Sequence, residues 1–224
     1  MPSRLNHAIF PFLFLTSIVV CDALAFQDSQ ANAEDLLRKS MSWMDTLYDP
    51  SAGYMFNAVE GALSHETRSS SWYAAGLLAR NVGDDAEQAA RIIHNIIGGQ
   101  NHNSSDQWYG DYQVYPEQPT VGTPAYPPVI YNSWDPNWRG FIGTTFIVIL
   151  EEFSNLLPSD LKDDMLQSLH LDAKGDTYRV GGVDDDNLYP SYSNAAIMHT
   201  ALSGWVGRHT NDSNFTAEGE RWGG

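Results

Sequence analysis

Cysteine is almost absent from this sequence, and its scarcity excludes several chemistries. The single cysteine, Cys21, lies in an N-terminal apolar segment that we expect to be removed. The mature chain would then have no disulfide bond, even in a compartment that allows one. Catalytic thiolates and thiolate–zinc sites are excluded. A chain of about 200 residues is long enough to be stabilised by one hydrophobic core alone.

Positive charge is also scarce, since 12 basic residues face 28 acidic ones and the formal net charge is −16. So acidic a chain is a poor partner for nucleic acid or for an anionic membrane surface. It would also repel polyanionic substrates unless the site is locally basic. Neutral glycans, small apolar compounds and cations remain open as ligands. Acidity is equally common in proteins released into mildly acidic media.

Long apolar runs are missing except at the N-terminus, where residues 8–21 are almost continuously apolar. Arg4 and His7 precede this run, and the small-x-small pattern of residues 23–25 follows it. This arrangement predicts a signal peptide over residues 1–25, because the run is too short to span a bilayer comfortably. A signal anchor is the alternative. We therefore expect a secreted, extracellular protein with one domain over residues 26–224.

Three acceptor sequons for N-glycosylation support export. They begin at Asn103, Asn211 and Asn214, and each lies in a stretch that we expect to be a loop. The expected protein binds neither nucleic acid nor membrane after signal cleavage, and its oligomeric state is left open.

Helical periodicity dominates the rest of the chain and predicts six helices. Their expected ranges are 31–48, 69–81, 86–97, 138–157, 161–169 and 191–208. Long connections over residues 49–68, 100–137 and 171–190 alternate with short ones. Successive connections of an up-and-down array fall at opposite ends, so the three long loops would gather at one end. An ordinary helical bundle is the alternative.

The sequence from Trp72 to Ala79, followed by residues 83–85 and an alanine-rich helix, resembles the hairpins of six-hairpin (α/α)-toroid glycosidases. Residues 137–140, leading into residues 146–152 and Leu157-Pro158, resemble a segment of unsaturated glucuronyl and rhamnogalacturonyl hydrolases. From about Gly61 onward the chain is similar to a group of secreted fungal proteins of this architecture. The resemblance implies an all-α fold of the α/α-toroid type and hydrolysis or elimination on a polysaccharide.

About six helices are half of a complete toroid, so we expect about half of the ring, with its long loops on one face. The domain over residues 26–224 would then be incomplete at the C-terminus.

Paired carboxylates are the chemistry that most glycosidases need, one acting as acid and the other as base or nucleophile. Asp135 and Asp186 are the predicted catalytic pair, because each directly precedes a polar-aromatic step at the start of a helix. A carboxylate among tryptophans loses solvation, which raises its pKa towards that of a useful acid. The alternative is that each aspartate caps a helix or braces a loop.

Aromatic and polar residues crowd the predicted loops and are expected to contact a sugar, because aromatic faces stack on sugar rings. The predicted substrate-binding residues are His65, Glu66, Trp108, Tyr109, Asp111, Glu117, Trp134, Trp138, Arg139, Asp185, Tyr189 and Tyr192. Aromatic anchors would equally keep long loops folded without disulfides.

No cofactor or metal site is expected. Calcium at Asp184, Asp185 and Asp186 is a minor alternative, because the triplet lacks the spacing of a known calcium loop. The favoured function is therefore glycoside hydrolysis on a carbohydrate substrate. A polysaccharide lyase, with Tyr189 or His65 as base, and a non-catalytic glycan-binding or inactive truncated relative are the alternatives.

Overall fold

The structure is a computed structural model that describes residues 29–59, 62–176 and 193–223. The chain divides into two compact units, residues 1–43 and 44–224. In the first unit the described residues, 29–43, are helical, and the predicted signal peptide lies outside the described part. None of the described helices is long and apolar enough to cross a membrane.

The second unit begins with a small antiparallel sheet, which corrects the expected loop between the first two helices. A 3-10 helix, η1 (Asp45–Leu47), leads into β1 (Tyr48–Asp49), β2 (Tyr54–Val59) and β3 (Ala62–Glu66), in the order β1-β2-β3. The expected helix to residue 48 therefore ends earlier. Gly53, at a φ of +75°, allows the turn before β2, where an L side chain would be strained. The strands β2 and β3 are short and of mixed polarity. Their apolar and polar residues alternate too few times for the sequence pattern to distinguish them from a loop.

Among the described residues, six α-helices follow the sheet. They are α2 (Thr67–Arg80), α3 (Asp85–Gly98), α4 (Asn137–Phe153, extended by η2, Ser154–Leu156), α5 (Ser159–Asp176), α6 (Ser193–Thr210) and α7 (Ser213–Gly223). The predicted all-helical character is confirmed, apart from the sheet.

Two helices differ from expectation. The helix α5 continues to Asp176 instead of ending at residue 169, and α7 was not expected at all. The added turns of α5 bury Asp172 and Asp176, although aspartate ordinarily marks a solvent-exposed position. The helix α7 approaches α6 through glycines: a Cβ on Gly219 would lie 2.7 Å from the Cα of Gly204. A contact made by glycines leaves no stripe of large apolar residues in the sequence, so the pattern does not predict α7.

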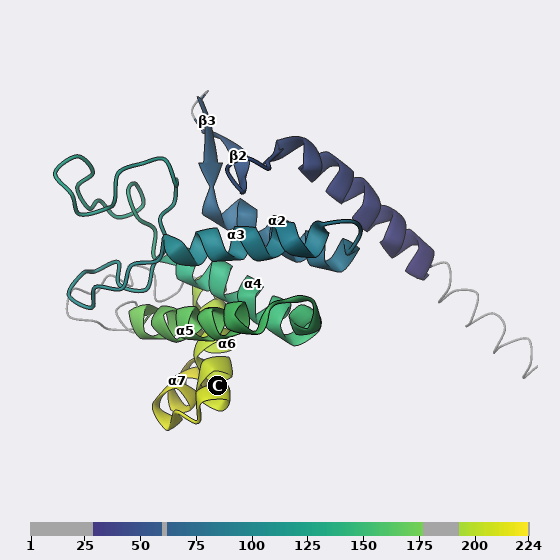
Figure 1. Cartoon of the computed structure of the whole chain (residues 1–224). Coiled ribbons are helices and arrows are strands. Elements are labelled where there is room, and N and C mark those ends of the chain that lie inside the picture. The colour runs from purple at the N-terminus through teal and green to yellow at the C-terminus, as the bar shows by residue number, and fades with distance from the viewer. Residues whose placement is uncertain (1–28, 60–61, 177–192, 224) are drawn as a thin grey trace, which may run out of the picture. The chain divides into compact units, whose positions relative to one another are not determined.

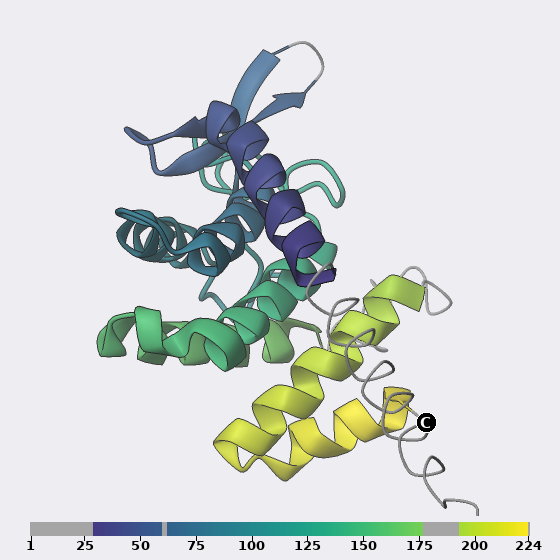
Figure 2. The ribbon, with the colours of Figure 1, turned by 90° about the vertical axis from the view of Figure 1, so that its right-hand side faces the viewer.

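The helices pack as consecutive hairpins (Figures 1 and 2). The pairs α2–α3, α4–α5 and α6–α7 are in contact, and α4 also packs against both α2 and α6. On the other side of the array α3 contacts α5. Fully buried side chains form the core between them, including Leu77, Ile93, Phe146, Met165 and Leu202. Each contributes about 1.5–3 kcal/mol relative to full exposure.

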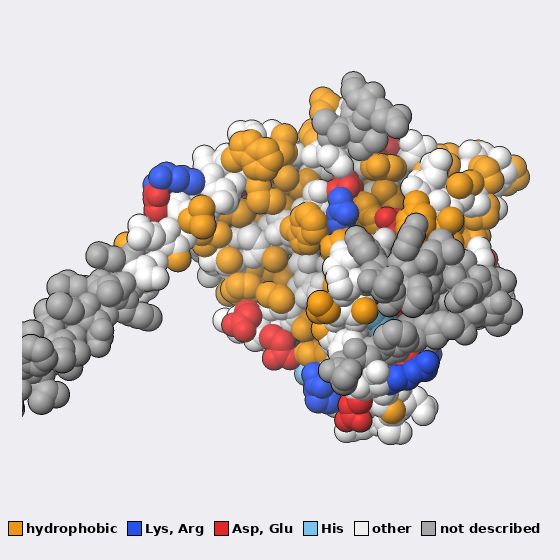
Figure 3. Space-filling model, turned by 180° about the vertical axis from the view of Figure 1, so that it is seen from behind, with side chains coloured by type: hydrophobic (Ala, Val, Ile, Leu, Met, Phe, Trp, Pro, Cys, Tyr) orange, Lys and Arg blue, Asp and Glu red, His pale blue; other side chains and the backbone are white. Residues whose placement is uncertain are grey.

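One face of this array presents exposed hydrophobic side chains. Figure 3 shows the molecule from behind, where hydrophobic side chains form several exposed patches among the charged ones. Large exposed hydrophobic residues include Trp72 on α2, Val148 on α4 and Ile197 on α6, which are 44%, 50% and 68% exposed. The row α2–α4–α6 thus carries apolar surface that the described residues do not cover.

Connection lengths place the irregular chain at one end of the hairpins. The sheet precedes α2, and residues 99–136 join α3 to α4 without a helix or named strand. The predicted long irregular section over residues 100–137 is thereby confirmed. Short connections join α2 to α3 and α4 to α5 at the other end (Figure 1). The connection between α5 and α6 lies outside the described residues.

Candidate functional site

A pocket of about 450 Å³ opens at the loop end, which is a typical size for a small-molecule site. Its walls come from β2, the start of α2, the end of α3 and the irregular section. The lining residues are Tyr54, Thr67, Asn95, Gly98, Gly99, Gln100, Asn101, Asp106, Trp108, Asp111, Tyr112, Gln113, Pro116, Gln118, Thr120, Val121 and Trp134. Three predicted sugar contacts, Trp108, Asp111 and Trp134, therefore meet in one pocket.

Aromatic residues form one wall of the pocket. The ring centroids of Trp108 and Trp134 lie 6.3 Å apart, at an interplanar angle of 46°. Gly122, at a φ of +90°, lets the chain pass against Trp108, since a Cβ there would lie 2.7 Å from Cζ2 of the indole. Elsewhere in the lining the Tyr54 hydroxyl donates to the Asn95 carbonyl at 2.9 Å. Burial, with the charge of Glu117 adding to it, raises the pKa of Tyr54 to about 12.

Asp111 is the most unusual group in the pocket wall, because it is only 2% exposed. Its Oδ1 accepts a hydrogen bond from the backbone N–H of Tyr112 at 2.9 Å, whereas Oδ2 has no partner. Burial raises the pKa of Asp111 to about 8, against the opposing effects of Arg139 and the Tyr112 N–H. The negative charges of Asp135 and Asp176 raise it further. Asp111 is therefore predominantly protonated at mildly acidic pH.

Gln100 places a second unpartnered polar atom in the same pocket wall. Its Nε2 donates to the carbonyls of Gly110 and Ser168 and to Oδ1 of Asp172, at 2.9, 3.1 and 2.9 Å. These contacts fix the amide orientation and leave Oε1 buried without a partner. Buried polar atoms are nearly always paired in native proteins. A ligand rich in donors, such as a polyhydroxylated one, would match this wall.

Behind the pocket lies a buried group that we call the Arg139 cluster: Arg139, Asp111, Asp172 and Asp176. Arg139 donates from Nε to Asp176 at 3.0 Å and from a terminal nitrogen to the Tyr109 carbonyl at 3.0 Å. Asp172 accepts from the Tyr112 hydroxyl at 2.9 Å, and burial raises its pKa well above the ordinary value. Three carboxyl groups thus share one guanidinium in the interior.

Two glycines allow the irregular section to reach the Arg139 cluster. Gly110 has a φ of +76°, and a Cβ there would lie 2.3 Å from the Leu171 carbonyl oxygen. A Cβ on Gly175 would lie 2.0 Å from the Tyr109 carbonyl oxygen. Side chains at these positions would push residues 109–111 away from α5 and remove Asp111 from its place.

The predicted catalytic pair is only half described. Asp135 accepts through Oδ1 from both the backbone N–H and the side-chain amide of Asn137, at 2.9 and 2.7 Å, which caps the start of α4. It is not among the described residues that line the pocket. Asp186 lies outside the described residues, as do Asp184, Asp185, Tyr189 and Tyr192.

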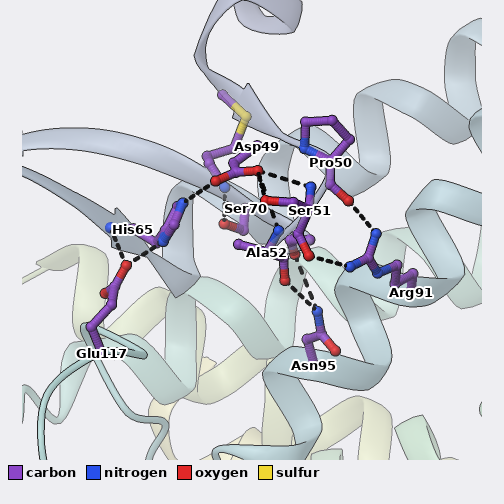
Figure 4. A network of polar contacts seen from close by, with 11 residues as sticks. Asp49, Pro50, Ser51, Ala52, His65, Ser70, Arg91, Asn95 and Glu117 are labelled. Carbon is purple, nitrogen blue, oxygen red and sulfur yellow. Dashed lines mark hydrogen bonds and ion pairs between the residues drawn. The ribbon is translucent and has the colours of Figure 1, made fainter.

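Five other predicted sugar contacts have partners within the protein. Glu66 caps α2 by accepting from the Ser69 N–H at 3.2 Å. Trp138 is 4% exposed, and its ring centroid lies 5.0 Å from the Arg68 guanidinium. Arg139, at 1% exposure, is held inside the cluster. His65 contacts Glu117, as Figure 4 shows.

The predicted glycosylation sites are all exposed. Asn103 lies in a turn and donates to Asp106 at 3.0 Å, and Asn211 lies between α6 and α7 at a φ of +54°. Asn214 corrects the expectation of a loop, because it belongs to the first turn of α7. In the described part of the chain, no three His, Cys, Asp or Glu side chains come together as a metal site.

Sequence reasoning did not select Gln100, Asp106, Asp172 or Asp176, which build the pocket wall and the cluster behind it. A signal for two of them was present. Asp172 and Asp176 continue the spacing of Met165 and Leu169, so they fall on the buried face if the helix extends.

The molecule is thus an array of helical hairpins with a small sheet and an aromatic, acidic pocket at its loop end. Residues 34–224 match the family model described as a domain of unknown function, DUF8769, and the chain belongs to this family. No curated protein and no solved structure matches the chain.

Proposed function

We propose that the chain is a secreted carbohydrate-active protein that hydrolyses a glycosidic bond in the pocket at its loop end. The observation that carries this proposal is Asp111, a buried carboxyl with a pKa of about 8 in the wall of an aromatic pocket. A carboxyl kept protonated by burial is the form that a glycosidase needs as its acid. Trp108 and Trp134 supply the aromatic faces on which a sugar ring stacks.

In this proposal Asp111 gives its proton to the glycosidic oxygen as the bond from that oxygen to the anomeric carbon breaks. A water molecule adds to the anomeric carbon and gives its proton to a second carboxylate, so one hydroxyl forms on each product. We propose Asp106 as that second carboxylate, because it lines the same pocket. The side-chain amides of Asn101 and Asn103 donate to it at 3.0 Å each and fix its position.

Asp135, chosen from the sequence, has an indirect role in this scheme. Its carboxylate caps α4, and its charge contributes to the raised pKa of Asp111. The proton donor of this scheme is therefore Asp111, in place of either member of the predicted pair, Asp135 and Asp186.

We further propose that the hairpins are part of an α/α toroid. In such a ring one helix of each hairpin faces inward, and the loops at one end form the active site. The contacts of α4 with both α2 and α6, with α3 and α5 packed together on the other side, support this arrangement. The position of the pocket at the loop end supports it as well.

Glycan binding without catalysis is the second candidate, and one observation favours it. Asp111 is only 2% exposed. A ligand therefore reaches its carboxyl group only if neighbouring residues of the pocket wall move slightly. The unpartnered Oε1 of Gln100 and the aromatic wall would serve binding equally well.

The test uses the full-length chain secreted from a eukaryotic host, with release of reducing ends measured from a panel of neutral and acidic polysaccharides. Hydrolysis should be lost in Asp111→Asn, by about 10²–10⁴-fold for removal of a general acid. Asp164→Asn is the matched control, because Asp164 is an exposed residue of α5. If both variants bind a saccharide and neither the variants nor the wild type hydrolyses it, the function is glycan binding and not hydrolysis. Turnover that survives in Asp111→Asn would contradict its assignment as the acid.

A further inference from the structure

His65 on β3 lies between two carboxylates that belong to different parts of the chain (Figure 4). Its Nδ1 contacts Oε1 of Glu117, and its Nε2 lies 3.3 Å from Oδ2 of Asp49 on β1. The second contact has an ion-pair distance without hydrogen-bond alignment. The backbone N–H of His65 donates to the same Glu117 oxygen at 3.1 Å. The imidazole ring stacks on Phe56, with centroids 4.3 Å apart.

Each ring nitrogen of His65 faces a carboxylate oxygen. A neutral imidazole has one N–H, so its other nitrogen would direct a lone pair at a carboxylate oxygen. The imidazolium can donate on both sides. Hydrogen bonds from the hydroxyl and N–H of Ser51 lower the pKa of Asp49 to about 2, so this partner stays charged. In the described part of the chain, three titratable groups face His65: Asp49, Glu117 and Tyr54. The ring centroids of Tyr54 and His65 lie 6.1 Å apart.

Glu117 belongs to the pocket rim, which we define as residues 115–121. Within the rim, Pro116, Gln118, Thr120 and Val121 line the pocket. The Gln113 side chain holds the rim together by donating to the carbonyls of residues 115, 118 and 119, at 3.3, 2.9 and 3.1 Å. A segment braced in this way tends to move as a unit, and the His65–Glu117 contact joins it to the sheet.

We propose that His65 is a protonation-dependent clasp that positions the pocket rim. When His65 is protonated, it links β1 to the rim and the pocket keeps its described shape. Loss of the proton leaves one ring N–H for two carboxylates. With that N–H directed at Asp49, only the backbone N–H of His65 holds the rim at Glu117, and the attachment of the rim to the sheet weakens. This inference concerns the shape of the pocket alone, so it stands or falls independently of whether the chain acts on carbohydrate.

Nuclear magnetic resonance of the full-length chain, without ligand, tests the clasp. The ring nitrogens of His65 and the backbone amides of residues 115–121 are followed as the pH rises. We expect the rim amides to shift with the same midpoint as the His65 ring. In Glu117→Gln this shared midpoint should vanish from the rim, while His65 still titrates. Hydrogen exchange of the rim amides should then rise roughly tenfold, because the rim opens locally.

His209→Gln is the control, because His209 stacks on Trp205 in α6 and makes no described contact with the rim. It should leave the rim titration unchanged. Rim amides that do not move across the titration of His65 would overturn the proposal. It would be overturned equally if Glu117→Gln retained the wild-type midpoint in the rim. His65→Gln is a second test of the proposal. In this variant the chemical shifts of the rim amides should not change with pH over the same range.

Discussion

Two arginine–aspartate groups at opposite ends of the hairpins show how the same residue types serve different purposes. We call Arg80, Asp45 and Asp85 the Arg80 cluster, which joins η1, α2 and α3 at the end with the short turns. All three guanidinium nitrogens of Arg80 donate to carboxylates, at 2.7–2.8 Å. In the Arg139 cluster, at the loop end, three carboxyl groups share one guanidinium, and Oδ2 of Asp111 has no partner.

The pKa values of the two clusters move in opposite directions. Burial raises the pKa of Asp85, but hydrogen bonds from Arg80 and the Val82 N–H outweigh it, and the net shift is downward. Burial also dominates at Asp111, where it outweighs the charge of Arg139 and the hydrogen bond from the Tyr112 N–H, so the pKa rises to about 8. In the Arg80 cluster both carboxylates accept hydrogen bonds from the guanidinium, as is usual for a group that only stabilises the fold. The incomplete set of donors at the loop end, beside a pocket, is typical of functional sites.

The largest effect should come from Asp111→Asn, measured as unfolding free energy against pH. The pKa of Asp111 is raised from about 4 in the unfolded chain to about 8. Its contribution is therefore complete below about pH 4 and is lost as pH rises to about 8. Asparagine resembles the protonated acid, so the variant should match the wild type at pH 4 and exceed it at pH 8 by on the order of 5 kcal/mol. Equal stability profiles of the two proteins would contradict the protonated state of Asp111.

Arg139→Met should be the next largest change. It leaves Asp176 and its neighbours in the interior without their cation, and both Arg139 and Asp176 are 1% exposed. Breaking a buried ion pair in this way costs about 3–5 kcal/mol. Urea denaturation at pH 7 measures the loss. The control is Arg80→Met, whose partially exposed site should cost less; an equal cost would remove the distinction between the clusters.

Asp85→Asn should show the opposite pH dependence from Asp111→Asn. Because the pKa of Asp85 is lowered, its contribution is present above about pH 4 and disappears as the pH falls below this value. The loss of a charged hydrogen-bond acceptor should cost about 1–3 kcal/mol at pH 7. Thermal unfolding at pH 7 and pH 3 tests this prediction, and a cost that is larger at pH 3 would refute it.

The same contrast explains what the sequence could predict. Apolar spacing located α2, α3, α4 and α6 to within a few residues, since their buried faces consist of residues such as Leu77, Ile93 and Ile142. The irregular section was recognised because Tyr126 to Pro136 has no apolar period. Trp108, Asp111 and Trp134 were selected because aromatic and acidic residues on loops favour ligand sites.

The remainder depended on contacts between segments that are distant in sequence. Gln100 and Asp172 are hydrogen-bonded across 72 positions, and no local pattern indicates such a pair. The last turns of α5 were missed because their buried side chains are carboxyls, and polar residues ordinarily mark a solvent-exposed face. The α6–α7 contact depends on the glycines at 204 and 219, which have no side chain for a hydrophobic pattern to detect.

The smallest expected effect separates the two roles open to Asp135. As a cap of α4 it should tolerate Asp135→Asn with a loss below about 0.5 kcal/mol, because asparagine caps a helix as well as aspartate does. Asp135→Ala should cost about 1 kcal/mol, since it removes the acceptor for the Asn137 N–H. Both variants also remove a negative charge that raises the pKa of Asp111, so the pH profile of stability should shift slightly towards acid. If Asp135 were itself the catalytic acid, asparagine would abolish turnover as completely as alanine. Retention of turnover in Asp135→Asn, with loss in Asp111→Asn, would place the acid in the pocket wall and the cap outside it.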